Sequence, residues 1–418
     1  MHMTNVDLAT DLTNIRAEFP ALAGSQIYLD NAGGSQVLKR VADRIHDYLL
    51  TTSVQLGASY PQSQLASQRV IGARRAVAEL INAEHDEEVV MGGSSTGLMF
   101  LFTQALADSI RAGDEIIVTN TDHEANIGGW LRLQKAGAVI RFWDVNIDSL
   151  ELELDDLQRL LNPRTKWVAM THASNVLGTL NPVNEVAKMV HAVGGRLCLD
   201  GVAYAPHRLV DMQASGADIY VFSFYKVFGP HYAVLWGKRE LLRALPTLNH
   251  HFIGPEVLPY KLQPGNVNFE LSYGCAGIGE YLVDTGTRLG ATGTNRVRMQ
   301  HAFDAFARHE DRLAERLLSW LRSKSNVRII GHTTVSDANA QTARMPTVSF
   351  IVDGKRSESI VLHTDKFNVG IRFGDFYARR LIEALKLQAH GGVVRVSIAH
   401  YNSMQEIDTL LTHLEEVV

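Results

Sequence analysis

The feature that most constrains the fold is an alternation of apolar runs and amphipathic helical segments between about residues 87 and 237. The apolar runs are EEVVMG, DEIIVTN, AVIRFWDV, TKWVAMTHAS, GRLCLDG, ADIYVFSF and YAVLWG, and most of them end in Gly, Asn, Asp or Ser. Between them, a helical period is followed by Leu98, Leu101, Phe102, Ala105 and Leu106, and again by Val183, Val186, Ala187 and Val190. This pattern predicts an α/β fold with a mostly parallel seven-stranded sheet that is covered on both faces.

The sequence pattern changes after about residue 290, where the alternation of apolar runs and helical segments ends. A charged helical stretch, TRLGATGTNRVRMQHAFDAFARHEDRLAERLLSWLRS, is followed by the strand candidates TVSFIV and VVRVSIAHY and by a closing helix whose Ser403 and Glu406 have capping-box spacing. A chain of 418 residues also exceeds what one core usually organises. We therefore expect an N-terminal segment (1–25) that packs with a small domain, a large domain (26–290) and a smaller α+β C-terminal domain (291–418).

The amino-acid composition indicates which kinds of molecule this chain binds. Apolar residues make up 46% of the chain and charged residues 20%, and the formal net charge of −5 is spread along the sequence. This gives no reason to expect a nucleic acid or a membrane as partner, so small molecules are favoured. Cys198 and Cys275 lie far apart and in no metal-ligand spacing, which argues against a disulfide framework or a metal site. Without an apolar signal core or a run of about 18 apolar residues, we expect a cytoplasmic protein.

One lysine raises a chemical question. Lys226 lies in SFYKVFG, among three aromatic residues and directly after an apolar run. The conservative interpretation is that its stem packs on the aromatic rings while its ammonium group reaches water. The alternative is a partly deprotonated amine that forms a Schiff base with a carbonyl compound.

Other polar groups follow the predicted strands, at the edge where α/β sheets bind ligands. Residues 92 to 97, GGSSTG, combine glycines and hydroxyls at a predicted helix N-terminus, which suits phosphate, although serine caps are common. Asp200 is either a turn residue or a carboxylate for a pyridinium nitrogen. His123, in TDHEAN, is either a polar loop residue or an imidazole that stacks on a flat ring, and Asn175, in SNVLGT, can donate to a phenolic oxygen. Together with the amine of Lys226, these groups match the needs of pyridoxal 5'-phosphate.

The order YLDNAGG, GGSSTG, DHEAN, SNVLGT, DG and SFYK resembles the class V aminotransferase group of fold-type I pyridoxal-phosphate enzymes over nearly the whole chain. The resemblance is closest to cysteine desulfurases and their relatives. It implies that Lys226 holds the cofactor as a Schiff base, that Asp200 keeps the pyridine nitrogen protonated, that His123 stacks on the ring and that Asn175 lies near the phenolic oxygen.

The same resemblance implies further roles and a homodimer. The phosphate would be bound by Ser94, Ser95 and Ser223. It would also be bound by Asn266, although the Gly265-Asn266 pair here departs from the glycine-threonine pair with which the family reaches the phosphate of the partner subunit. The substrate would be bound by Arg395, which holds its carboxylate, and by Arg372, Asn31 and Tyr377.

The sequence departs from the desulfurase pattern at the reacting group. In VGIRFGDFYARRL, the position of the cysteine that carries sulfur as a persulfide corresponds to Tyr377, and a phenol cannot hold a persulfide. Neither Cys198 nor Cys275 is a convincing substitute. Tyr225 and Ala203 also stand where the family often has His and Gln.

These differences preserve the residues expected to bind the cofactor but change the residues that determine which reaction takes place. We therefore expect an enzyme acting on an α-amino acid, with cleavage at Cβ of a cysteine-derived substrate as the leading hypothesis, because β-elimination needs no protein thiol. Transamination, epimerisation and a catalytically silent scaffold are the alternatives.

Overall fold

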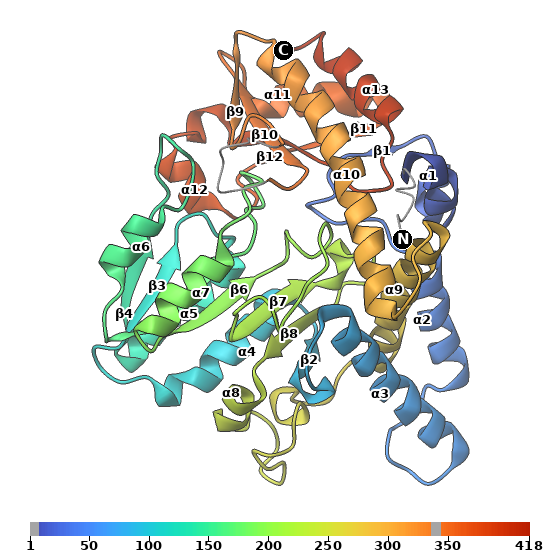
Figure 1. Ribbon diagram of the computed structural model, residues 1–418, viewed down its shortest axis with the longest axis vertical. Helices are drawn as coiled ribbons and strands as arrows, with labels where there is room; N and C mark the ends of the chain where they lie inside the picture. Colours follow the sequence, from blue (N-terminus) through green and yellow to red (C-terminus); the bar gives the residue numbers. More distant parts are fainter. Residues whose placement is uncertain (1–7, 336–343) are drawn as a thin grey trace.

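The computed structural model describes residues 8–335 and 344–418 and is built around two sheets (Figure 1). The larger sheet has seven strands, as predicted, in the order β2-β8-β7-β6-β5-β3-β4. Its strands are β2 (Val89–Gly92), β3 (Glu115–Thr119), β4 (Val139–Trp143), β5 (Thr165–Thr171), β6 (Arg196–Asp200), β7 (Ile219–Ser223) and β8 (Ala233–Gly237). Only β8 runs against its neighbours in this sheet, so the mostly parallel arrangement is confirmed.

Alternate residues of these strands enter two different cores. In β5, Trp167 and Ala169 pack with α4 (Ser95–Leu106), α5 (Gly128–Arg132) and α8 (Arg239–Ala244). Val168 and Met170 point to the opposite face, which is covered by α3 (Pro61–Ile81), α6 (Leu154–Leu160), α7 (Val183–Ala192) and α9 (Phe269–Arg288). Because side chains alternate across a strand, a strand buried on both faces needs a continuous apolar sequence. This requirement explains the seven runs.

The smaller sheet is antiparallel and has the order β12-β13-β10-β9. Its strands are β9 (Val327–Ile330), β10 (Thr347–Val352), β12 (Arg372–Gly374) and β13 (Val393–Ser397). It packs with α11 (Ser357–Thr364) and α13 (Met404–Leu414) around a core of its own. The Ser403–Glu406 capping box at the start of α13 is present, as predicted. The helix α12 (Arg379–Ala384) follows β12.

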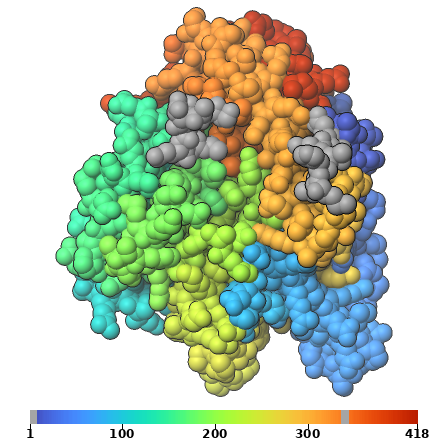
Figure 2. Space-filling model, in the orientation of Figure 1, coloured from blue at the N-terminus to red at the C-terminus, as the bar shows by residue number. Residues whose placement is uncertain are grey.

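The N-terminal part of the chain forms one strand of a further, two-stranded sheet and also joins the smaller sheet. After α1 (Leu8–Ala17), β1 (Ile27–Tyr28) pairs in parallel with β11 (Val369–Gly370). Asp30 then forms a bridge to Ser397 at the end of β13. The next helix, α2 (Lys39–Thr51), packs against α9, and the space-filling view shows the connection from α2 to α3 as a separate projection (Figure 2).

The sequence suggested one helix for the charged stretch that begins at residue 287, but the structure has two helices there. α9 ends at Arg288, and α10 (Asn295–Arg322) begins only after a turn in which Gly290 and Gly293 have φ of +96° and +104°. Such angles favour glycine, so the two glycines permit the reversal. Figure 1 shows α10 extending from α9 to the smaller sheet. This helix contributes Phe303 to one core and Leu317 to another. The domain bounds at residues 25 and 290 stay a prediction.

Two sequence-based expectations are visible in the fold. Both cysteines are free thiols buried in the cores, Cys198 in β6 and Cys275 in α9. Among the residues that the structure describes, no helix combines the length and the apolar character needed to span a bilayer.

Candidate active site

Lys226 ends a single 3-10 turn (Phe224–Lys226) that directly follows β7. Only 7% of the residue is exposed, so its amine does not reach bulk water, and the snorkelling interpretation does not describe this lysine. Burial, helped by the charge of Arg395, lowers its pKa from 10.5 to about 8. Within the described part of the chain, the amine has no hydrogen-bond acceptor. A buried amine of this kind is available as a nucleophile or a base.

The amine opens into a cavity of about 90 Å³ at the carboxyl ends of the central strands. Seven of the residues predicted from the sequence line this cavity together: Ser94, Ser95, His123, Asn175, Asp200, Ser223 and Lys226. They follow β2, β3, β5, β6 and β7, so the parallel sheet is what collects them from distant parts of the chain.

Hydroxyl groups and a helix N-terminus form one end of the cavity. Ser94 is the N-cap of α4, and its Oγ accepts a hydrogen bond from the backbone N–H of Gly97 at 3.0 Å. The Oγ of Ser223, from β7, donates to the Oγ of Ser95 at 3.0 Å. The first backbone N–H groups of a 12-residue helix, together with these hydroxyls, form a place suited to an anion such as phosphate.

Asp200 lies at the end of β6 and is buried. Its Oδ1 accepts a hydrogen bond from the backbone N–H of Val202 at 2.9 Å, while Oδ2 has no donor among the described residues. Burial raises the pKa of the carboxyl to about 6. Near neutral pH, Asp200 therefore presents a carboxylate oxygen that can accept a bond from a cationic N–H group in the cavity.

A second buried carboxyl, that of Asp122, lies behind His123 and was not foreseen from the sequence. It accepts hydrogen bonds from Thr119, Asn126 and the backbone of Thr171. Burial, reinforced by the charge of Asp200, raises its pKa to about 7. Asp122 thereby ties the end of β3 to the end of β5, and it fixes the backbone from which His123 enters the cavity.

The ring of His123 is held in a defined orientation. Its Nδ1 accepts a hydrogen bond from the backbone N–H of Ala125 at 3.0 Å, so the proton of the neutral ring is on Nε2. Burial and the nearby Lys226 lower its pKa to about 4. His123 is therefore a neutral, flat group, which suits stacking better than acid catalysis near neutral pH.

Arg395 forms the corner of the site next to the smaller sheet. Its guanidinium is buried, and it donates from Nη2 to Oδ1 of Asp30 at 2.8 Å and from Nη1 to the carbonyl oxygen of Asn175 at 3.1 Å. Arg372 is 3.6 Å from the other oxygen of Asp30. Two arginines thus share one carboxylate, and the surplus positive charge favours a second anion at this corner.

Five predicted residues lie outside the cavity lining: Arg395 and Arg372, which form the corner just described, and Asn31, Asn266 and Tyr377. The amide of Asn31 is buried among Tyr28, Ser397 and Asn402, and its Oδ1 accepts a bond from the hydroxyl of Tyr401. Asn266 is exposed in the loop before α9. The side chain of Tyr377 is also largely exposed, and its ring lies 5.1 Å from that of His123 between centroids.

Asp30 and Phe376 also contribute to this corner of the site, and neither is predicted from the sequence. Asp30 lies in the motif YLDNAGG, so its place beside the site could have been suspected, but its pairing with Arg395 spans 365 positions and leaves no local signal. Phe376 lies with its ring 3.7 Å from the guanidinium carbon of Arg395. A phenylalanine in a loop carries no sequence signal for such a contact.

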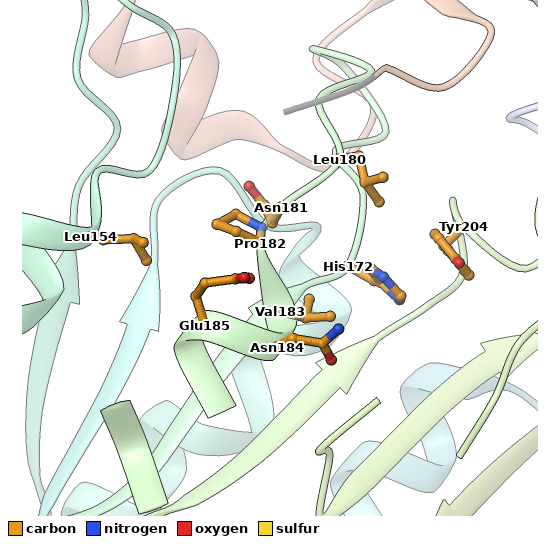
Figure 3. A pocket seen from close by; sticks show the side chains of 9 residues that line it. All are labelled: Leu154, His172, Leu180, Asn181, Pro182, Val183, Asn184, Glu185 and Tyr204. Carbon is orange, nitrogen blue, oxygen red and sulfur yellow. The ribbon is translucent and has the colours of Figure 1, made fainter. Parts of the chain in front are cut away.

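A larger cavity of about 510 Å³ is lined by His172, which directly follows β5, and by residues that include Glu185 and Tyr204 (Figure 3). Thr171 lines the smaller cavity and His172 lines the larger one, because consecutive residues of an extended chain point to opposite sides. The larger cavity contains Glu185 and Tyr204 but no lysine, serine or arginine. It therefore lacks the groups that make the smaller cavity a candidate active site.

No thiol is among the residues that line the smaller cavity. Burial raises the pKa of Cys198 and Cys275 well above that of an ordinary thiol, which keeps both in the unreactive protonated form.

Comparisons with known proteins identify the family of this chain. The sequence profile of the family Aminotransferase class-V matches residues 27–265 and 289–410. The chain is 40% identical to the aminotransferase-like protein FGM3 of Gibberella zeae, over 97% of this chain and 98% of that protein. It is 33% identical to the cysteine desulfurase-like protein ustD of Aspergillus flavus, over 99% of this chain and 92% of that protein.

A solved structure supports the same assignment. The cysteine desulfurase CsdA of Escherichia coli superposes with a TM-score of 0.82 at 25% identity, covering 97% of this chain and 98% of that one. The chain therefore belongs to the class V aminotransferases, a family of pyridoxal-phosphate-dependent enzymes that includes the cysteine desulfurases.

Proposed function

We propose that this chain binds pyridoxal 5'-phosphate on Lys226 and cleaves a bond at Cβ of a cysteine-derived α-amino acid by β-elimination, without a protein persulfide. The observation that carries the proposal is the cavity itself. Among the described residues, the amine of Lys226 is buried without an acceptor and one carboxylate oxygen of Asp200 has no donor; the third component is a hydroxyl-lined helix N-terminus.

The residues present fit the cofactor. Ser94, Ser95 and Ser223 would hold the phosphate, and the free oxygen of Asp200 would accept the pyridinium N–H. His123 presents a neutral ring, and one proton of the Asn175 amide remains for the phenolic oxygen because the other is donated to the carbonyl oxygen of Phe376. When bound, the cofactor supplies an electron sink that stabilises negative charge at Cα of an attached amino acid.

The chain's own groups would then handle the substrate. Arg395 can orient the α-carboxylate, because its guanidinium is buried and the anionic charge beside it is shared with Arg372. Lys226 is the base for the α-proton, since its lowered pKa leaves part of the amine deprotonated near neutral pH. A β-substituent that is a good leaving group departs without accepting anything from the protein.

The absence of a thiol from the cavity lining favours elimination over sulfur transfer to the protein. At the position where the desulfurase pattern has cysteine, Tyr377 is 68% exposed, and its hydroxyl has no bonding partner in the described ranges. Cys198 and Cys275 lie in the two cores. A reaction that releases the sulfur group directly needs none of these residues.

The test is a spectral and product assay with the purified protein. We expect visible absorbance after pyridoxal phosphate is added, loss of that absorbance in Lys226→Ala, and pyruvate plus ammonia in equal amounts from S-substituted cysteines. Transamination would instead convert the S-substituted cysteine to the 2-oxo acid that keeps its sulfur substituent, with the amino group passed to an acceptor and no pyruvate released. Epimerisation would yield solvent-isotope exchange without ammonia. A protein that takes up no cofactor would be a silent scaffold and would refute the proposal.

We further propose a homodimer. Exposed apolar residues gather on α2 and α3, among them Leu50 with 71% of its surface exposed, and they offer apolar area for a second copy. Asn266 is exposed in the loop before α9, as a residue that reaches the partner subunit must be. A cytoplasmic location stays a prediction from the sequence.

A further inference from the structure

Two consecutive aromatic residues, Phe376 and Tyr377, lie in the connection between β12 and α12, and we call them the aromatic cap. Both have left-handed backbone angles, with φ of +52° and +59°. Bulky residues rarely adopt this conformation, which costs about 1 kcal/mol or more for each residue. Contacts in the surrounding structure must therefore hold the cap in place.

The cap is anchored to the large sheet at the two loops that carry His123 and Asn175. The Nδ2 of Asn175 donates to the carbonyl oxygen of Phe376 at 3.0 Å, and the backbone N–H of Glu124 donates to the carbonyl oxygen of Tyr377 at 2.8 Å. Arg380, at the start of α12, forms an ion pair with Glu124 at 2.7 Å. These contacts hold the segment that carries Phe376 and Tyr377 against the loops of the large sheet.

The ring of Phe376 covers Arg395. It lies 3.7 Å from the guanidinium carbon, within the range of a cation–π contact. The guanidinium is then restrained in three ways: by Asp30 at Nη2, by the carbonyl of Asn175 at Nη1, and by the ring on its face. Its Nε is buried and has no acceptor among the residues described.

We propose that Phe376 is a positioning residue, which sets the plane of the Arg395 guanidinium and thereby the affinity of the site for a substrate α-carboxylate. This inference rests on the proposed function. Without the ring, water reaches the guanidinium, and the arginine is free to turn fully toward Asp30. A carboxylate that arrives with the substrate then competes with both water and Asp30, whereas contacts with the amino group of the substrate are unchanged.

The test measures how much the carboxylate contributes to ligand affinity, apart from the rest of the ligand. L-Alanine and ethylamine differ only by the carboxylate, and neither has a β leaving group. The dissociation constant of each is measured from the change in visible absorbance of the holoenzyme, and the ratio of the two constants reports the contribution of the carboxylate. We expect Phe376→Leu to reduce the preference for L-alanine by about tenfold, as the loss of a buried cation–π contact implies, while the affinity for ethylamine and the cofactor absorbance stay unchanged.

Two variants serve as matched controls. Phe376→Tyr keeps a ring over Arg395 and should retain the preference of the parent protein. Phe367→Leu removes a ring of the smaller domain that stacks on His413 at 3.8 Å, away from the cavity, and it should also leave the preference unchanged. If Phe376→Leu does not fold, Phe376→Met provides the same measurement.

A double-mutant cycle completes the test. In an Arg395→Gln background, Phe376→Leu should have no further effect on the preference, because the ring acts through the guanidinium. An undiminished preference in Phe376→Leu, in a protein that still takes up the cofactor, would overturn the role of Phe376 and leave the proposed function standing. A parent protein without cofactor absorbance would overturn both.

Discussion

The buried amine of Lys226 can be tested directly in the protein without cofactor. With a pKa lowered from 10.5 to about 8, the deprotonated fraction at pH 7 rises from about 0.03% to about 9%, a difference of roughly 300-fold. We expect reductive methylation of Lys226 by formaldehyde and cyanoborohydride, followed by peptide mass spectrometry, to have a midpoint near pH 8. Nα-acetyl-lysine, treated in the same buffers, supplies the unperturbed reference.

The cause of the shift predicts the effect of a substitution. Burial and Arg395 lower the pKa of Lys226, whereas the carboxylate of Asp200 raises it. Asp200→Asn should therefore move the midpoint to lower pH and increase modification at neutral pH, although the same variant should lose enzymatic activity. Asp144→Asn, at an exposed position, should leave the midpoint unchanged. A midpoint near pH 10 in the parent protein would show that Lys226 is an ordinary lysine, and the reasoning from burial would fail.

Three further predictions concern the groups around this lysine. Ser223→Ala should weaken the affinity for pyridoxal phosphate by about tenfold or more, the effect of one hydrogen bond to a charged group, and equilibrium dialysis with Ser359→Ala as an exposed control measures it. Arg395→Lys should weaken amino-acid binding by roughly 2 kcal/mol without altering the visible spectrum, because lysine lacks the planar fork, and unchanged kinetics on the true substrate would show that the carboxylate is held elsewhere. Burial raises the pKa of Asp122 from 3.8 to about 7 in the folded protein. The proton bound by this carboxyl therefore stabilises the fold fully below the unfolded-state pKa of 3.8, and the stabilisation is lost as the pH rises through 7. With a pKa near 7, the contribution of Asp122 to the free energy of unfolding falls by about 1.4 kcal/mol when the pH is raised from 6 to 8. Urea unfolding of the apoprotein at the two pH values should show this loss in the parent and a smaller one in Asp122→Asn, and equal losses would contradict the assignment.

The sequence predicts the large sheet well because each of its strands is buried on both faces and must be apolar throughout. It also predicts the residues that follow those strands, such as Asp200 and Lys226, because strand ends of a parallel sheet meet at one edge. The turn between α9 and α10 was missed although Gly290 and Gly293 signal it, because the helical period continues on either side.

The corner of the site around Arg395 could not be predicted in the same way. Its partners come from a segment near the N-terminus (Asp30), a strand-end loop (Asn175) and the β12–α12 connection (Phe376), and no local pattern links them. Tyr377 was noticed only as a replacement for cysteine, whereas the neighbouring Phe376 makes the closer contact with a charged group. Tertiary packing, rather than propensity, decides such positions.

The pairing of Asp30 with Arg395 also bears on how the protein is made. The two residues are 365 positions apart, and β1 joins β11 across a similar separation. Residues 27 to 30 leave the ribosome long before their partners, because Arg395 is synthesised 365 residues after Asp30. Contacts of such long range close slowly, so this part of the site is completed after the strands of the large sheet have been made. A nascent chain that stops before β13 leaves Asp30 without its arginine, however well the large sheet has already folded.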